Sequence, residues 1–322
     1  MLDLRRLEVL SAFSRRGSIA AAAQELGVSP SAVSQQLSAL EREAQVSLIE
    51  RTAHSASLTD AGEELVEHAT TILAAVEAAE SRMRERSGTI AGRVRVSFIP
   101  GLAAAAAPDL AELQRQHPEL NVVALQIEST AASAALLDRT TDIAVVDEWG
   151  EEALVTSGPL RAQRGHREAI VLALPADHPV ALSHLHKPVS AATLRELVRT
   201  ETWLSSPPGQ VSRMAGDARL ADLGAIPFRR WEFDGLYVLA RLVAVGSGIT
   251  LLPSSVAAYE RNVAGIPLRP RMYRSVRVLT RTSSQGDPRI DACLKAIRQG
   301  LRHPWTEPLT ASSPRPLSQH TR

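Results

Sequence analysis

The segment GSIAAAAQELGVSPSAVSQQLSALE, residues 17–41, decides how the N-terminal part of the chain folds. Gly17 and Gly27 interrupt the helical spacing of its apolar residues, and a glycine is a common residue just after the end of a helix. Ser18 and Ser29 can each cap the helix that follows, and a proline directly after Ser29 is typical of a helix start. The segment therefore predicts a short helix, a glycine turn and a second, longer helix.

The longer helix has two different faces. Val33, Leu37 and Leu40 repeat at helical spacing and predict a buried side. The opposite side carries small or amide side chains that can approach the edges of bases: Ser31, Ser34, Gln35 and Ser38. A further amphipathic helix is predicted over residues 4–13, so the whole pattern indicates a helix-turn-helix, with an ordinary three-helix bundle as the alternative.

The residues that follow favour DNA binding. Residues 48–49 and 56–58 can form two short strands around a tip at residues 52–55, which would make a wing. Arg51 and His54 lie beside that tip, where a phosphate contact is expected. The net charge is only +1, so this interpretation rests on where residues lie and not on bulk charge.

Residues 4–65 resemble the LysR-type regulator family, whose helix-turn-helix reads GSxxxAAxxLxVSxSAVSxQLxxLE and whose wing ends in LTxAG. The matching residues include Gly17, Ser18, Ala22, Leu26, Val28, Ser29, Ser31, Ala32, Val33, Ser34, Gln36, Leu37, Leu40, Glu41, Leu58, Thr59, Ala61 and Gly62. The resemblance implies a transcription regulator that binds double-stranded DNA. We expect the DNA contacts to come from Ser18, Ser29, Ser31, Ser34, Gln35, Ser38, Arg51 and His54. Ala20 and Gln35 depart from the usual family residues and leave the base preference open.

A long helix is predicted over residues 59–86, a span of 28 residues that ends at Gly88. It would be about 42 Å long. Its apolar residues are spaced 4, 3, 4, 3 and 4 apart, which is typical of a coiled-coil seam. These residues are Leu65, Ala69, Ile72, Val76, Ala79 and Met83. We expect this helix to form a homodimer, and the family resemblance suggests a further pairing into a tetramer. The alternative is that the helix packs on its own winged domain.

From Gly92 onward, strands alternate with helices, which predicts a parallel sheet. The first run has strands at 93–99, 121–128 and 143–146 and helices at 102–116 and 130–139. A second lobe has strands near 169–174, 202–204, 228–233 and 249–252, with helices near 191–198, 210–222 and 235–245. A strand at 276–282 and a helix at 288–302 return to the first lobe. The segments ALPADHPVA and LVAVGSGITLLP match the second lobe of LysR effector domains.

The expected fold class is α/β, with an all-α winged-helix N-terminal domain and a C-terminal domain that resembles the two-lobed periplasmic-binding proteins. The expected parts are a DNA-binding domain at 1–58, a dimerisation helix at 59–88, an effector-binding domain at 89–303 and a tail at 304–322. The first lobe would take residues 92–160 and 270–303, and the second 161–269. The tail is rich in Pro, Ser and Thr, which predicts disorder.

In open α/β sheets, ligands bind beyond the carboxyl ends of the strands, where helix N-termini present free amides. This rule places an effector site at Ile99, Pro100, Gly101, Leu102, Glu128, Ser129, Thr130, Asp147, Ser205 and Ser206. The alternative is that these residues only form tight turns. We expect the effector to be a small organic acid with an apolar part, held between residues 99–102 and Ser205–Ser206.

The sequence argues against two other classes of protein. It has no phosphate loop, dinucleotide fingerprint, zinc-protease motif or nucleophile elbow, so we expect neither an enzyme nor a cofactor. His184 and His186 form the only close histidine pair, which predicts a surface loop more than a metal site. A transport binding protein would need an export signal, which the N-terminus lacks; we therefore expect a cytoplasmic protein without a membrane span. The single Cys293 lies in an apolar helical pattern and is expected in the core, with a redox sensor as the alternative.

Overall fold

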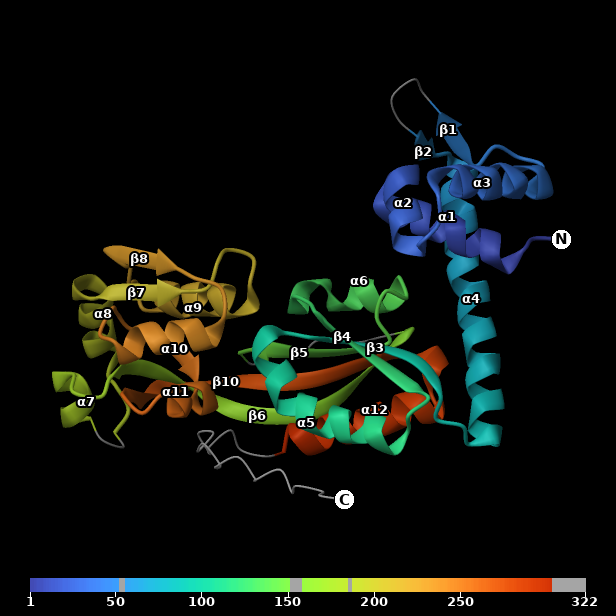
Figure 1. The fold of residues 1–322 in the computed structure, drawn as a ribbon. Coiled ribbons are helices and arrows are strands. Elements are labelled where there is room, and N and C mark those ends of the chain that lie inside the picture. The colour runs from blue at the N-terminus through green and yellow to red at the C-terminus, as the bar shows by residue number, and fades with distance from the viewer. Residues whose placement is uncertain (52–55, 151–157, 185–186, 303–322) are drawn as a thin grey trace, which may run out of the picture.

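The structure, a computed structural model, describes residues 1–51, 56–150, 158–184 and 187–302. Figure 1 shows a helical N-terminal part, a long helix that descends from it, and two lobes that are joined by long strands. The predictions for His54, for His186 and for the tail at 304–322 lie outside the described residues.

The N-terminal part begins with three helices: α1 (Leu4–Arg16), α2 (Ile19–Leu26) and α3 (Pro30–Ala44). Asp3, Ser18 and Ser29 cap them, because each side chain accepts hydrogen bonds from backbone N–H groups in the first helical turn. Gly17 and Gly27 end α1 and α2 with φ angles of +66° and +67°, a conformation that favours glycine. The predicted helix-turn-helix is therefore confirmed.

The wing consists of β1 (Ile49–Arg51) and β2 (Ala56–Leu58), which pair in antiparallel fashion. The chain then turns tightly into α4 (Asp60–Ser87), whose first turn is capped by Thr59. A Cβ atom added to Gly62 would lie 2.2 Å from the carbonyl oxygen of Leu48. Only glycine therefore fits at this corner, which gives a physical reason for the final residue of the wing motif.

The helix α4 has 28 residues and ends at Gly88, as the sequence predicts. Ala69 is fully buried in the core of the winged-helix part, and Leu65 packs against the same core. The prediction that Ala69 faces a partner subunit is therefore wrong. For Leu65, the structure agrees with the alternative, in which the start of the helix packs on its own winged domain. Spacings of three and four residues occur both in coiled coils and in helices that pack on their own domain, so the sequence pattern could not separate the two.

The largest sheet has six strands in the order β4-β3-β5-β10-β6-β9. They are β3 (Gly92–Phe98), β4 (Leu120–Gln126), β5 (Ile143–Trp149), β6 (Leu160–Pro175), β9 (Thr250–Pro253) and β10 (Val263–Arg281). β3 pairs in parallel with β4 and β5, as predicted, whereas β10 runs antiparallel to β5 and β6. The predicted strands at 169–174 and 276–282 were too short, because β6 and β10 have 16 and 19 residues and extend from one lobe into the other (Figure 1).

Helices cover both faces of the sheet in the first lobe. These are α5 (Pro100–Gln116), α6 (Ala132–Leu137) and α12 (Pro288–Gly300), with short 3-10 turns η1 (Ser129–Ala131) and η2 (Thr282–Ser284). Ile143 and Val145 of β5 lie in one core with α5 and α12, while Ala144 and Val146 lie in another with α6. This alternation buries the strand on both sides, as its continuous apolar sequence indicates.

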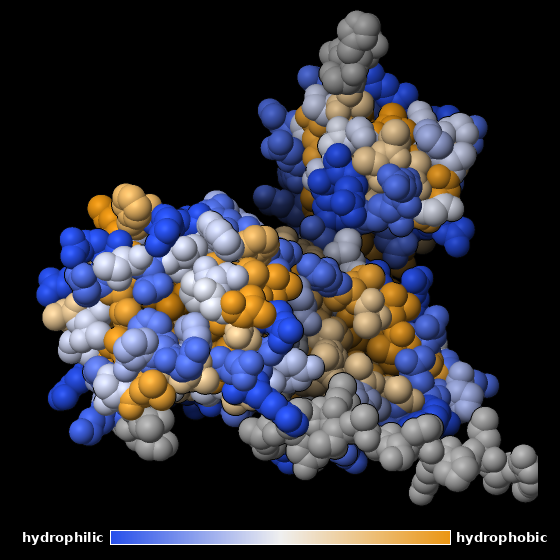
Figure 2. All heavy atoms as spheres, turned by 60° about the vertical axis from the view of Figure 1, so that its left-hand side comes forward, coloured by the Kyte–Doolittle hydropathy of each residue, from blue (hydrophilic) through white to orange (hydrophobic). Residues whose placement is uncertain are grey.

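The second lobe contains β9, the C-terminal end of β6, the N-terminal end of β10, and a separate parallel pair, β7 (Thr202–Ser205) and β8 (Arg229–Glu232). Its helices are α7 (Pro179–Ser183), α8 (Ala191–Thr200), α9 (Val211–Asp222), α10 (Leu236–Ala244) and α11 (Ser254–Tyr259). The two shortest, α7 and α11, were not predicted, because five or six residues are too few to show a helical period. Figure 2 shows the winged-helix part projecting above the body that the two lobes form. Within the described ranges, no helix is both long enough and apolar enough to cross a membrane.

Candidate functional site

The outer face of α3 is the candidate DNA-binding surface. Ser31 and Gln35 are exposed, and Ser34 and Ser38 are half-buried beside them. On the opposite side, Val33, Leu37 and Leu40 are at most 1% exposed and hold the helix on the core. These four side chains therefore share one uncharged polar face, which α1 and α2 leave open.

Two further predicted DNA contacts also have a structural role. The hydroxyl oxygens of Ser18 and Ser29 accept hydrogen bonds from the N–H groups of Ala21 and Ala32, each at 3.2 Å. Ser29 Oγ also lies 2.9 Å from Ser31 Oγ. A hydroxyl that accepts through its oxygen still has a hydrogen to donate, so capping and a phosphate contact are compatible.

Arg51 connects the wing to α3. Its Nη2 donates to Ser38 Oγ at 3.0 Å, and its side chain is exposed. The carboxylate of Glu41 accepts from the N–H groups of Leu48 and Ile49, both at 3.1 Å, and so fixes the start of β1 against α3. Glu41 matches the last residue of the family motif, but the motif does not show that its side chain holds the wing. Its place in the last turns of α3, shortly before the wing, was the available signal.

The second half of α4 carries the remaining predicted dimer residues. Ile72 and Met83 are 36% and 59% exposed, Ala79 is exposed and Val76 is half-buried. Leu73, which the predicted seam left out, is buried at 7%. An exposed apolar stripe thus remains on α4, but it begins beyond the winged-helix core.

Charged residues attach α4 to the first lobe. Arg281 at the end of β10 donates to Glu77 of α4 at 2.8 Å and to Asp142 at 2.8 Å, and Arg139 lies 3.1 Å from Glu77. Burial alone would raise the pKa of Glu77, but the hydrogen bonds from Arg281 and Ser283 and the nearby positive charges hold that pKa below its usual value. Sequence reasoning missed this cluster, because its members come together from distant positions and no local motif marks them.

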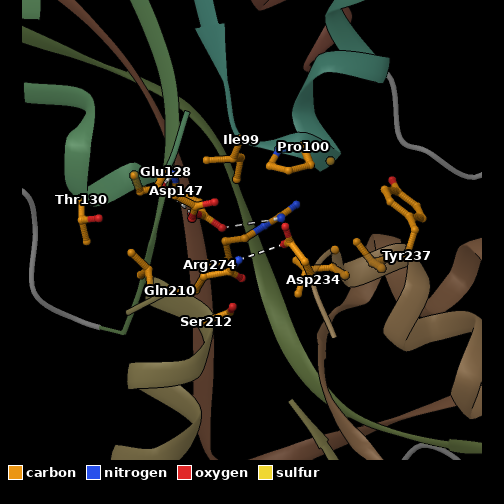
Figure 3. A pocket seen from close by; sticks show the side chains of 16 residues that line it. Ile99, Pro100, Glu128, Thr130, Asp147, Gln210, Ser212, Asp234, Tyr237 and Arg274 are labelled. Carbon is orange, nitrogen blue, oxygen red and sulfur yellow. Dashed lines mark hydrogen bonds and ion pairs between the residues drawn. The ribbon is translucent and has the colours of Figure 1, made fainter. Parts of the chain in front are cut away.

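A pocket of about 610 Å³, counted with the open solvent at its mouth, lies between the two lobes. Its first-lobe wall contains seven of the ten predicted effector residues: Ile99, Pro100, Gly101, Glu128, Ser129, Thr130 and Asp147. Residues of the second lobe face them, among them Gln210, Ser212, Asp234 and Tyr237, and Arg274 of β10 lies between the two walls (Figure 3).

Three predicted effector residues do not line this pocket. Leu102 is 1% exposed and belongs to the first-lobe core, because it points inward from the first turn of α5. Ser205 and Ser206 line a smaller neighbouring pocket, where Ser206 Oγ lies 2.8 Å from Ser212 Oγ. The second-lobe wall instead uses the start of α9 and the loop after β8. The same strand-end rule, applied to the strand predicted at 228–233, would have pointed to Asp234.

The inner part of the pocket holds a network of buried charges. Asp147 accepts from the hydroxyl of Ser129 at 2.9 Å and from the indole N–H of Trp149 at 2.8 Å. Arg274 is 2% exposed and donates through Nη2 to Glu168 at 2.6 Å. Its Nη1 lies 3.8 Å from Asp147 and has no hydrogen-bond acceptor within the part of the chain that is described. A buried donor of this kind is costly unless a ligand or water accepts from it.

The mouth of the pocket brings the lobes close together. A Cβ atom added to Gly101 would lie 3.4 Å from Cε2 of Tyr237. Tyr237 itself packs edge-on against Tyr259, with the ring centres 5.0 Å apart. A methyl group at position 101 would just touch this ring, so side chains larger than that of alanine must displace an aromatic ring that Tyr259 supports from behind.

The structure places Cys293 in the core of the first lobe, fully buried between α12 and the sheet. Burial raises the pKa of its thiol to about 12, so the thiol stays protonated and unreactive at neutral pH. This supports a core residue over a redox sensor. Among the residues that the structure describes, no group of three His, Cys, Asp or Glu side chains is arranged to hold a metal ion.

Comparison with known proteins identifies both parts of the chain. Residues 4–63 match the model of the bacterial regulatory helix-turn-helix protein, lysR family, and residues 87–302 match the LysR substrate binding domain. The nitrogen assimilation regulatory protein nac of Klebsiella aerogenes is 30% identical over 266 residues, which are 80% of this chain and 80% of that protein. The transcriptional regulator CbbR of Rhodospirillum rubrum is 26% identical over 85% of this chain and 90% of its own length.

The fold agrees with these relatives. A full-length OxyR structure from Pseudomonas aeruginosa superposes with a TM-score of 0.65 at 20% identity, over 94% of this chain and 95% of that one. Both matched models and the relatives are those of transcriptional regulators and not of enzymes. The chain therefore belongs to the LysR family of DNA-binding transcriptional regulators, with a helix-turn-helix domain at its N-terminus and an effector-binding domain after the linker helix.

Proposed function

We propose that this regulator reads its operator through the exposed face of α3, and that a small molecule in the pocket between the lobes changes its DNA binding or its activation of transcription. The observation that supports the second part is that the walls of the pocket come from both lobes, which approach each other at Gly101 and Tyr237. A ligand that contacts both walls binds the closed arrangement better than the open one, and such a difference in affinity is what shifts an equilibrium.

For DNA recognition, we propose that Ser31, Ser34 and Gln35 contact bases. The side-chain amide of Gln35 is exposed and can form two hydrogen bonds with the edge of an adenine. Ser18, Ser29, Ser38 and Arg51 would contact or position phosphates around this helix, and His54 keeps the same proposed role. None of the three residues proposed to contact bases is charged, so sequence specificity would depend on one amide and two hydroxyl groups.

For the effector, we propose a small molecule with an apolar portion, which Ile99, Pro100 and Tyr237 can contact. An acid group on this molecule could accept a hydrogen bond from Nη1 of Arg274. The same pocket also contains three carboxylates, from Glu128, Asp147 and Asp234. An organic acid without any cationic group is therefore disfavoured there. The sequence led us to expect an organic acid of any kind, and the pocket restricts this to acids that also carry a positive charge.

We also propose that the active form is a homodimer that pairs through Ile72, Val76, Ala79 and Met83 of α4. The exposure of Ile72 and Met83 supports this, since apolar side chains on a helix are stabilised when a partner covers them. By resemblance to its family, the dimer would pair again into a tetramer and would work in the cytoplasm.

DNA selection with the purified full-length protein tests this function. Duplexes with random sequence should yield an enriched motif with two related half-sites, bound at least about 1,000-fold more tightly than unrelated DNA. The variant Gly101→Trp, which fills the mouth of the pocket, should select the same motif with the same affinity, because the winged-helix domain is remote from the pocket (Figure 1). Failure to enrich any motif would refute sequence-specific binding.

A further inference from the structure

The pocket between the lobes has an excess of negative charge. Glu128, Asp147 and Asp234 line it, and Arg274 is the only lining residue with a positive side chain among those described. That guanidinium is already bonded to Glu168, which it contacts through Nε at 3.2 Å and Nη2 at 2.6 Å. Because Arg274 pairs with Glu168 and also lies 3.8 Å from Asp147, its charge balances neither Glu128 nor Asp234.

The three carboxylates differ in how well they are satisfied. Asp147 accepts hydrogen bonds from Ser129 and Trp149, and Asp234 accepts one from Gln210 at 2.9 Å. The carboxylate of Glu128 has no hydrogen bond or ion pair within the described ranges, although its side chain is half-buried. Burial, followed by the charges of Asp234 and Asp147, raises the pKa of Glu128, as expected for a carboxylate that lacks a cation.

Glu128 and Asp234 lie on different lobes, so the force between their charges affects how closely the lobes approach each other. Glu128 follows β4 in the first lobe, whereas Asp234 follows β8 in the second, so the two approach the pocket from opposite walls (Figure 3). Two negative charges on opposite walls repel each other when nothing lies between them. A cation between them would remove this repulsion and attract both walls, which favours closure of the lobes.

We propose that the effector carries a protonated amine or guanidinium group, which binds between Glu128 and Asp234. This proposal rests on the proposed function, because it assigns a chemical class to the ligand of the same pocket. At the other end of the ligand, an oxygen acceptor takes the hydrogen bond that Nη1 of the 98% buried Arg274 lacks. Either a carboxylate or a carbonyl oxygen can accept this hydrogen bond. The ligand class therefore includes amino acids as well as amines that carry a neutral oxygen acceptor, and the cationic group is what all of them have in common.

Three probes with the same number of carbon atoms test which charged group of the ligand is needed for binding. Pentylamine carries only the cation, 5-aminopentanoate carries both charges, and pentanoate carries only the acid. Binding to the full-length protein is measured by calorimetry and by the rise in melting temperature. We expect both amines to bind, with 5-aminopentanoate the tighter because it also reaches Arg274, and we expect pentanoate to bind far more weakly than either.

Two isosteric variants locate the site. Glu128→Gln and Asp234→Asn should each weaken binding of both amines at least about tenfold, because each removes a charge-assisted hydrogen bond and keeps the side-chain shape. Glu119→Gln, at an exposed position just before β4, is the matched control and should bind like the wild type. Melting curves without probe show whether each variant is folded.

The possible outcomes show separately whether the cationic ligand class is wrong and whether the proposed regulatory function is wrong. Amine affinities that neither Glu128→Gln nor Asp234→Asn changes would overturn the proposal, and so would binding of pentanoate alone or of no probe. Binding of pentanoate that Gly101→Trp abolishes would overturn the cation while the pocket remains an effector site. Amine binding that depends on Glu128 but leaves operator affinity and transcription unchanged would support the ligand class and refute the proposed coupling to DNA.

Discussion

Replacing Arg281 with methionine should loosen the attachment of the linker helix to the first lobe. The Arg281 side chain is 6% exposed, and its guanidinium donates to Glu77 and Asp142 and to the carbonyl oxygens of Leu136 and Thr141. Methionine keeps most of the side-chain volume but leaves these acceptors unpaired. Removing one partner of a buried ion pair typically costs about 3–5 kcal/mol. Because Arg139 remains 3.1 Å from Glu77, we expect the lower end of that range.

Thermal unfolding measures this loss. For domains of about 150–250 residues, each kcal/mol lowers the melting temperature by about 2–4 °C, so a loss of about 3 kcal/mol corresponds to roughly 6–12 °C. Arg199→Met is the matched control, because Arg199 pairs with Glu196 at 2.9 Å but is 73% exposed. Exposed pairs contribute about 1 kcal/mol or less. If Arg281→Met destabilised the protein no more than Arg199→Met, the reasoning that buried charges hold α4 on the lobe would be refuted.

The cluster around Arg281 also predicts that the stabilisation provided by Glu77 depends on pH. The pKa of Glu77 is lower in the folded protein than the ordinary pKa of a glutamate, so the charge of Glu77 stabilises the fold at any pH above that ordinary value. This contribution is lost as the pH falls through the lower folded pKa. The stability difference between the wild type and Glu77→Gln should therefore be constant near neutral pH and shrink below about pH 4. Denaturant unfolding between pH 3 and 7 checks this, and a difference that grows on acidification would contradict it.

Three predictions concern DNA binding and assembly. Gln35→Ala should relax the preference at one base pair per half-site, by about 1–3 kcal/mol, without lowering the melting temperature; an unchanged preference in a randomised operator library would contradict the assignment. Arg51→Ala should weaken binding to all sequences alike and reduce the salt slope by about 1 per subunit; a loss confined to some sequences would make Arg51 a base reader. Ile72→Glu combined with Val76→Glu should abolish the dimer and tight operator binding together, because unpaired charges are costly to bury; a dimer by light scattering with full operator affinity would place the interface elsewhere.

The sequence predicted the N-terminal part well because local signals determine it. Asp3, Ser18 and Ser29 act on the helix that each begins, and Gly17 and Gly27 act where a helix ends. These signals need no knowledge of distant contacts. The role of Ala69 was mistaken for the opposite reason, since its place in the seam or in its own core depends on what the rest of the fold puts beside it.

In the pocket, too, some residues could be predicted from local sequence signals and others depend on distant contacts. The first-lobe wall followed from a rule about strand ends, which applies to any parallel sheet and correctly indicated Glu128 and Asp147. Arg274 could not be found in this way, because it lies inside β10 and its partner Glu168 lies 106 residues away on β6. Antiparallel pairing of these two long strands brings the residues together, and no local pattern marked how far either strand extends.

The attachments of α4 restrict how the pocket can influence DNA. Arg281 holds α4 on the first lobe at Glu77, and Arg84 of α4 pairs with Asp287 at 2.9 Å. While these pairs persist, the first lobe and the linker helix move as one unit. A ligand that draws Asp234 toward Glu128 then moves the second lobe against that unit and leaves α4 in place. Under the proposed function, a single chain would therefore not transmit closure to its winged-helix domain. The signal would instead pass from the second lobe to another copy of the chain, which gives the proposed homodimer a role in the response.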